Sequence, residues 1–341
     1  MSNKQVGFTL VELMVALALG LVISAAATML FLTASRSQTL QQGQASLQDD
    51  ANFGLNAITQ DIRLGNLNSL ISNINDSITY GGVIFRSRAN PLTVNGTDTA
   101  NLPMTLEGSS VAVNLLSRSH SHSAGATPQW SGISNADTYS SDQLSIQYLP
   151  QYILDDKRTP STVDDVWYGG FDCEGNELEF TLDEGRHVIV QRYFLRVDDN
   201  KNSNEPNQAL ALACDAGHYP LDGDPTTIKN FGDAGQIILK RADHFRVLYG
   251  IQNGPNHRYI DAKTYLDLPA PRPRILLVQL GILGRSNQSV GHGGSFEDGQ
   301  VFQVLDQAVS IKTPAAGSPK YARQVVTQSV ALRNTFGERG Q

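Results

Sequence analysis

The most apolar stretch of the chain lies at its N-terminus. Residues 7–35 read GFTLVELMVALALGLVISAAATMLFLTAS, and residues 13–35 carry no charged side chain. As a helix, these 23 uncharged residues extend roughly 35 Å, enough to cross a hydrocarbon core of about 30 Å. The pattern predicts that residues 8–35 form a transmembrane helix.

The helical pattern continues beyond the uncharged stretch. Residues 36–66 are mostly polar, but apolar residues recur among them every three, four or seven positions, as on one face of an amphipathic helix. These residues are Leu40, Leu47, Ala51, Leu55, Ile58 and Ile62. No proline precedes Pro91, so nothing forces a break. We expect one helix over residues 8–65, on the order of 85 Å long, whose second half packs on a folded head.

The rest of the chain has the pattern of a β-rich domain. Residues 67–141 are rich in Ser, Asn, Thr and Gly, and they predict an irregular region with short strands at 82–86 and 111–116. Residues 142–341 contain β-branched or aromatic runs separated by turn residues. These runs span residues 144–149, 178–182, 188–197, 245–251, 274–283 and 325–332. The predicted fold class is α+β, with an antiparallel sheet laid across one long N-terminal helix.

The order of the first residues gives the strongest indication of function. Only MSNKQVG, residues 1–7, precedes the apolar run, and Lys4 is its one charge. A secretory signal peptide has its small-residue cleavage site after the apolar core, whereas here Gly7 lies before it. The apolar helix is therefore expected to remain on the mature protein.

These residues resemble the N-terminal signal of type IV pilins and type II secretion pseudopilins. The shared pattern is a short basic leader ending in glycine, then Phe-Thr-Leu, a glutamate and an apolar helix. The resemblance implies that a prepilin peptidase cleaves after Gly7 and that the new N-terminus, Phe8, is methylated. It also implies that Glu12 takes part in subunit assembly.

The position of Glu12 has two physical interpretations. A carboxylate at membrane depth is costly, so it needs a partner or a function. Glu12 lies near the start of the apolar run, and it could simply reach the headgroups beside Lys4. The family pattern favours a pair between Glu12 and the amine of Phe8 on a neighbouring subunit, which would set the register of packed helices.

Composition bears on the class of partner and on the state of the two cysteines. The chain has 341 residues and a formal net charge of −7, and it has no basic stripe, so a nucleic-acid partner is not expected. Its two cysteines, Cys173 and Cys214, would lie beyond the membrane in an oxidising compartment, which favours a disulfide over two separate buried thiols.

No constellation of residues predicts an enzyme. The sequence lacks a G-x-S-x-G motif, a P-loop and an H-E-x-x-H motif, and we expect no cofactor and no metal. His120 and His122 are interpreted as part of a polar loop. The oxygen-rich segment from Asp198 to Asn204 lacks the glycine and the closing glutamate of an EF-hand, so a turn is favoured over a calcium site. The aromatic residues Trp167, Tyr168 and Phe171 are expected in the core beside the disulfide.

The C-terminal half is similar to the PilW class of minor pilins. The resemblance rests on the cysteine pair, on FRVLYGI at residues 245–251 and on SVALRNTFG at residues 329–337. It implies a minor pilin that primes assembly of a type IV pilus and lies at or near the tip, supporting adhesion and twitching motility. The alternatives are a type II secretion pseudopilin of the J or K type and, less favoured, a membrane-anchored periplasmic enzyme or binding protein.

The same resemblance implies the partners and the location. The partners are other minor pilins, the major pilin, a tip adhesin, the prepilin peptidase, the inner-membrane assembly platform and, before assembly, membrane lipid. The protein would span the bacterial inner membrane once with its head in the periplasm, and would reach the pilus at the cell surface after assembly.

Overall fold

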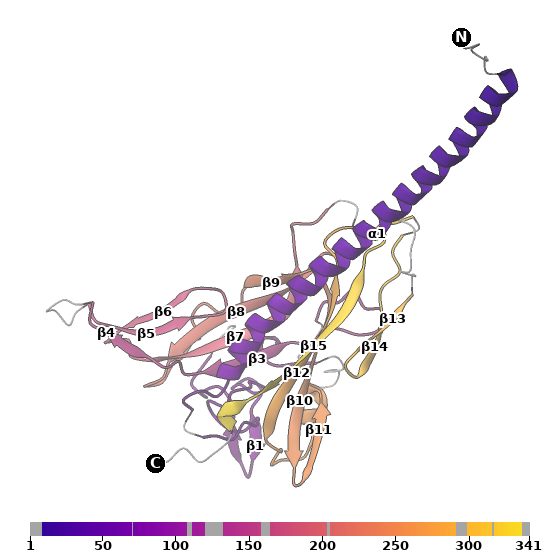
Figure 1. Ribbon diagram of the computed structural model, residues 1–341. Coiled ribbons are helices and arrows are strands. Elements are labelled where there is room, and N and C mark those ends of the chain that lie inside the picture. The colour runs from indigo at the N-terminus through magenta and orange to yellow at the C-terminus, as the bar shows by residue number, and fades with distance from the viewer. Residues whose placement is uncertain are drawn as a thin grey trace.

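The computed structural model describes residues 9–69, 71–107, 111–119, 132–157, 164–202, 205–290, 299–315 and 317–335. Its fold is a long N-terminal helix that projects from a β-rich head (Figure 1). The predictions made for Gly7 and Phe8, for His120 and His122, and for Asn204 concern residues outside these ranges.

Helix α1 spans Leu10–Leu64 without interruption. Its buried residues begin at Leu47 and continue to Ile62, along the face that the spacing of apolar residues predicted. The N-terminal half extends away from the head, and the C-terminal half lies across it (Figure 1). The amphipathic pattern therefore correctly located the half of the helix that packs on the head.

Two four-stranded antiparallel sheets form the body of the head. The first has the order β3-β7-β8-β9, with bounds Leu144–Tyr148, His187–Val197, Leu210–Pro220 and Gln236–Lys240. The second has the order β11-β10-β12-β15, with bounds Asn256–Ile260, Ala242–Asn253, Ile275–Arg285 and Arg323–Ala331. All pairings in both sheets are antiparallel.

Smaller elements extend this body. A three-stranded sheet in the order β4-β5-β6 comprises Ile153–Asp155, Val166–Phe171 and Glu177–Thr181, and we call it the arm because it projects to one side of the head (Figure 1). Two hairpins pair β1 with β2, at Leu92–Val94 and Thr97–Thr99, and β13 with β14, at Val301–Val304 and Gln307–Ser310. The short helix α2 spans Ala262–Asp267.

Helix α1 packs along the seam between the two large sheets. It contacts β9, an edge strand of the first sheet, and β15, an edge strand of the second. Leu55, Ile58 and Ile62 belong to one hydrophobic core with residues of both sheets, among them Leu239 and Val330. The helix therefore contributes to the core of the head as well as anchoring it.

Close approach of the helix to the sheets depends on glycines. An added Cβ at Gly54 of α1 would lie 3.1 Å from Cβ of Leu239 on β9. An added Cβ at Gly284 of β12 would lie 2.8 Å from a methyl carbon of Leu47. Gly20, in the projecting half, has nothing within 4 Å of such an atom. Glycine thus permits tight packing only in the half of α1 that touches the head.

The structure corrects two short strands of the prediction. Residues 111–116 do not form a strand: Val113–Leu115 is a 3₁₀ turn. Residues 82–86 contribute only an isolated bridge between Val83 and Ile146. Both segments nevertheless follow the first sheet, because Ile84 donates a backbone hydrogen bond to Ser145 and Ser117 donates one to Ile84. They are extended segments that pair locally, and their apolar side chains fill the core.

Candidate functional site

The projecting half of α1 exposes its apolar side chains on every face. Residues 9–39 are all exposed, and Leu10, Met29 and Phe31 keep 75%, 70% and 71% of their surface accessible. Within the described ranges, α1 is the one helix long and apolar enough to cross a membrane. An apolar surface of this extent is unfavourable in water, so it requires lipid or other subunits around it.

Glu12 and Thr9 together cap the N-terminus of this helix. Thr9 is the N-cap, and its hydroxyl accepts a hydrogen bond from the Glu12 backbone N–H at 3.2 Å. In return, the Glu12 carboxylate accepts from the Thr9 backbone N–H at 2.9 Å and from its hydroxyl at 3.0 Å. This capping box satisfies two helix N–H groups and orders the Glu12 side chain within one subunit.

The helix half that covers the head also has an exposed face. Phe53 lies there with 78% of its surface accessible, although the neighbouring residues Ala51 and Leu55 are buried against the sheets. A single exposed apolar side chain is common on protein surfaces and does not by itself mark a contact. The candidate assembly surface is therefore confined to the projecting half of α1, where the exposed apolar residues are contiguous.

The structure contains a disulfide between Cys173 and Cys214. Cys214 lies on β8 with its side chain fully buried, whereas Cys173 follows β5 in the turn that leads to β6. The bond therefore joins the arm to the first large sheet, and the two cysteines are 41 positions apart in the sequence.

Acidic side chains gather around this junction. Burial raises the pKa of Asp61, on α1, to about 6, despite a hydrogen bond of 3.0 Å that the Tyr193 hydroxyl donates to it. Burial and then the nearby charges of Asp172, Asp233 and Asp215 raise the pKa of Glu174 to about 7. The helix, the arm and the sheet thus meet at carboxyl groups that are readily protonated.

Three of these carboxyl groups lie close enough together to hold a cation geometrically. Oxygens of Glu174, Asp215 and Asp233 lie within 4.8 Å of one another. Asp215 is already paired with Arg192, whose Nε lies 2.9 Å and Nη2 2.8 Å from its carboxylate. The Arg192 guanidinium neutralises the buried member of the group, so we assign no ligand to it.

The aromatic residues before Cys173 are not in the core, contrary to the prediction. Phe171 keeps 61% of its surface accessible, and Trp167 and Tyr168 are half-buried. The reason is their position in the arm, a single three-stranded layer with only one face against the first sheet. On the covered face Phe180 stacks on His187 of β7, with ring centroids 4.0 Å apart.

The oxygen-rich segment after β7 is a connection held by arginines. Asp198 accepts a hydrogen bond of 2.6 Å from Arg241, and Glu205 pairs with Arg241 at 2.8 Å and with Arg285 at 2.5 Å. All of these side chains are nearly buried. The carboxylates at both ends of the segment therefore have cationic partners within the chain, as a structural turn requires.

Comparisons with known proteins point to one family. Residues 194–334 match the family model described as type IV pilus-assembly protein W, PilW, and residues 2–28 match the prokaryotic N-terminal methylation motif. Among solved structures, a type IV-like pilin from Thermus thermophilus is similar with 15% sequence identity and a TM-score of 0.25, covering 60% of this chain and 81% of that chain. No curated protein matches the chain.

The matched ranges contain most of the residues already singled out. Gly7, Phe8 and Glu12 lie inside the methylation motif, and Cys214 and residues 245–251 lie inside the PilW match. Cys173 precedes the PilW match.

Proposed function

We propose that this chain is a PilW-like type IV minor pilin, which primes assembly of a pilus and lies at or near the tip. The observation that supports this role best is the fully exposed apolar half of α1, which continues from a head built partly on the same helix. The apolar half of α1 in such a subunit can be surrounded by lipid before assembly, and by the helices of neighbouring subunits after it.

The chemistry of Glu12 supports an ordered exchange of this kind. Within one subunit the carboxylate accepts two hydrogen bonds from Thr9 and has no cation near it among the described residues. Cleavage after Gly7 would create an amine at Phe8, and an amine on a neighbouring subunit could neutralise Glu12. Processing would then be coupled to assembly.

The proposed location and partners follow from this role. Before assembly the protein spans the inner membrane once with its head in the periplasm, where the assembly platform, the other minor pilins and the major pilin meet it. After assembly it reaches the cell surface, where it supports a tip adhesin, adhesion and twitching motility. The role is structural, in keeping with the pilin family and fold.

Labelling of assembled fibres tests the proposal. Antibody against the head, coupled to gold particles, is applied to sheared pili from cells that express the wild-type chain. We expect particles at fibre ends and few surface pili in cells that lack the protein. Particles spaced along the shaft, or normal pilus numbers without the protein, would contradict the proposed tip and priming roles.

A secretion pseudopilus remains the competing assignment, because its subunits share the N-terminal signal. Deleting the gene separates the two functions. Loss of surface pili with normal protein secretion supports the pilus, and the opposite pattern would assign the chain to a secretion system.

A further inference from the structure

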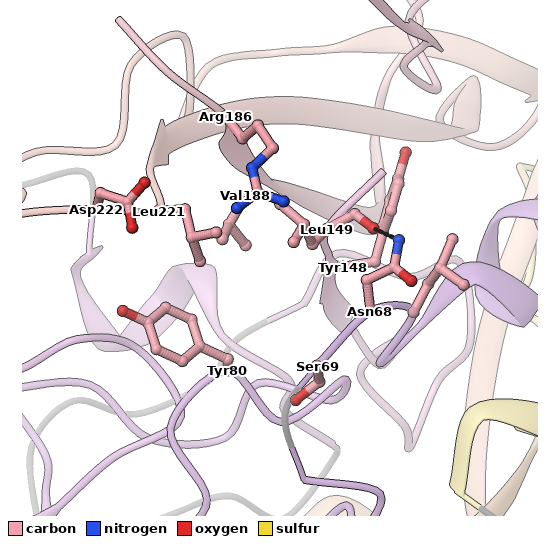
Figure 2. Close-up of a pocket in the computed structure, with 10 residues that line it drawn as sticks. Asn68, Ser69, Tyr80, Tyr148, Leu149, Arg186, Val188, Leu221 and Asp222 are labelled. Carbon is pink, nitrogen blue, oxygen red and sulfur yellow. Dashed lines mark hydrogen bonds between the residues drawn. The ribbon is translucent and has the colours of Figure 1, made fainter. Parts of the chain in front are cut away.

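A cavity of about 390 Å³ opens at one end of the first large sheet (Figure 2). Its walls come from the segment that follows α1, from the loop at Tyr80, and from the adjoining ends of β3, β7 and β8. None of these residues belongs to the exposed helix or to the disulfide junction. The cavity is therefore separate from the proposed assembly surface.

The walls of the cavity are mainly apolar. Tyr80 and Leu221 face one another across it, and Val188 and Leu149 line the side formed by β7 and the end of β3 (Figure 2). Its volume is at the lower end of the range for ligand pockets, about 300–1,000 Å³. It is thus large enough for a single side chain or a small molecule, but not for an extended peptide.

Two side chains of opposite charge, Arg186 and Asp222, line the cavity. Arg186 and Asp222 are exposed, and within the described part of the chain neither makes an ion pair or a side-chain hydrogen bond. In Figure 2 the Arg186 guanidinium reaches over the cavity, and the Asp222 carboxylate lies on the Leu221 side. Burial, and next the charge of Asp222, raises the pKa of Tyr80.

The cavity also contains an unsatisfied hydroxyl and a strained aromatic residue. The Ser69 side chain, only 9% exposed, has a buried hydroxyl that finds no hydrogen-bond partner among the described residues. Tyr80 has a φ of 65°, an unfavourable conformation for a bulky residue, held by a hydrogen bond of 2.8 Å from its N–H to the Asn101 carbonyl. Unsatisfied groups and backbone strain concentrate at binding sites.

We propose that this cavity binds an apolar amino-acid residue with a free α-carboxylate. The apolar side chain inserts between Tyr80 and Leu221, the carboxylate pairs with Arg186, and the amine or N–H group faces Asp222. A free amino acid and the C-terminal residue of a polypeptide both present these groups. The proposal is independent of where the subunit lies in a pilus.

Three related probes test the proposal with the full-length protein in detergent micelles, by isothermal titration calorimetry. L-Phenylalanine has both charges, N-acetyl-L-phenylalanine keeps only the carboxylate, and L-phenylalaninamide keeps only the ammonium group. We expect the first two probes to bind in the millimolar range or tighter, and the amide to bind at least about fivefold more weakly. Tighter binding of phenylalanine indicates a free amino acid, and equal or tighter binding of the N-acetyl form indicates a chain terminus.

Substitutions at the two charges assign the contacts. Arg186→Gln is expected to weaken phenylalanine and its N-acetyl form about fivefold, and Asp222→Asn to weaken phenylalanine without affecting the N-acetyl form. Arg258→Gln and Asp224→Asn are the matched controls, because both positions are exposed and neither lines the cavity. Leu221→Trp, which narrows the cavity opposite Tyr80, is expected to weaken binding of all three probes.

Two results would overturn the proposal. One is the absence of binding by any probe at about 10 mM, where even a Kd in the millimolar range is visible. The other is binding that Arg186→Gln and Leu221→Trp both leave unchanged while circular dichroism shows a folded head. Neither result would bear on pilus number or on the position of gold labels, so failure here is distinct from failure of the proposed function.

Discussion

Glu12 combines a local role as part of a helix cap with the proposed role as the partner of a neighbouring amine. Glu12→Gln keeps a hydrogen-bond acceptor for Thr9 but removes the charge, and Glu12→Leu removes both. We expect both variants to insert in the membrane and to co-purify with other minor pilins at least about tenfold less than wild type, because an unpaired partner amine in an apolar setting is costly. Quantitative co-purification measures this.

A variant of Thr9 separates the two roles. Thr9→Ala removes the N-cap, at a cost of about 1 kcal/mol to the helix, but keeps the carboxylate. Asp49→Asn, on an exposed turn of the same helix, is the charge control. If Thr9→Ala impairs co-purification as strongly as Glu12→Leu, the cap accounts for the effect and the intersubunit pair is wrong.

His218 predicts how the head responds to acid. It lies on β8 beside His187, with ring centroids 5.0 Å apart. Burial, and next the charges of His187 and Lys229, lower the pKa of His218 to about 4, although the charge of Glu184 acts to raise it. The unfolded chain binds the proton near pH 6.5, so the stability that neutral His218 contributes is complete above that pH and is lost towards pH 4. We expect His218→Phe to lose less stability than wild type between pH 7 and pH 4.5.

Thermal unfolding at the two pH values measures this difference. Asp61 and Glu174 act in the opposite direction, because their raised pKa values mean that acid stabilises the folded state relative to the unfolded one. Only the difference between the variant and wild type therefore isolates His218. An identical pH dependence in both proteins would contradict the assignment.

At the scale of elements, the glycines of α1 distinguish its two halves. Gly54→Val places a branched side chain where a Cβ is already 3.1 Å from Leu239, and we expect a loss of roughly 1–3 kcal/mol from overpacking. Gly20→Val, in open space, is the matched control and should leave the unfolding midpoint of the head unchanged. Denaturant unfolding in detergent compares them, and equal effects would refute the packing argument.

The disulfide connects the arm to a large sheet, and its contribution can be measured directly. Replacing Cys173 and Cys214 together by alanine is expected to lower the free energy of unfolding by up to about 4 kcal/mol, because the closed loop restricts the unfolded chain. Reduction of the wild-type protein should reproduce most of this loss. Unchanged stability after both treatments would show that packing alone holds the arm.

The strands that could be predicted from the sequence are those with a clear hydrophobic periodicity or a run of β-branched residues. Strands at residues 188–197 and 245–251 alternate or are β-branched, and the structure has them as β7 and β10. Strand β8 was missed, although it is among the longest, because LALACDAGHYP is rich in alanine and contains a buried Asp215. A strand covered on both faces by close neighbours needs small residues, so it loses the alternation that identifies exposed strands.

The candidate site also has parts that could be predicted from the sequence and parts that could not. The methylation motif lies in one short stretch, so the sequence alone reveals it, while cleavage after Gly7 and the role of Glu12 in assembly stay predictions. The pairing of Cys173 with Cys214 could be predicted because the chain has only two cysteines. The cavity could not be predicted, because Tyr80, Arg186 and Asp222 are brought together only when three separate segments converge. The exposure of Phe171 was also invisible, since it depends on the arm being a single layer.

For the whole molecule, the position of α1 between two sheets predicts where the chain can be shortened. A chain starting at residue 36 keeps every buried helix residue, and we expect a soluble monomer. A chain starting at residue 64 uncovers β9 and β15, two edge strands that we then expect to pair with other molecules. Size-exclusion chromatography distinguishes a monomer from aggregates, and a monomeric shorter chain would show that the helix is not needed to cover these edges.

The seam that α1 occupies also determines how the subunit bears force. In the proposed fibre, tension would enter each subunit through the projecting half of the helix and would reach the head through the stretch from Leu47 to Ile62. Because that stretch is wedged between two sheets, an axial pull loads its contacts with both sheets together, so they resist by shear and do not open one after another. A subunit built in this way transmits a pull to whatever its head holds, and the sheets share the load.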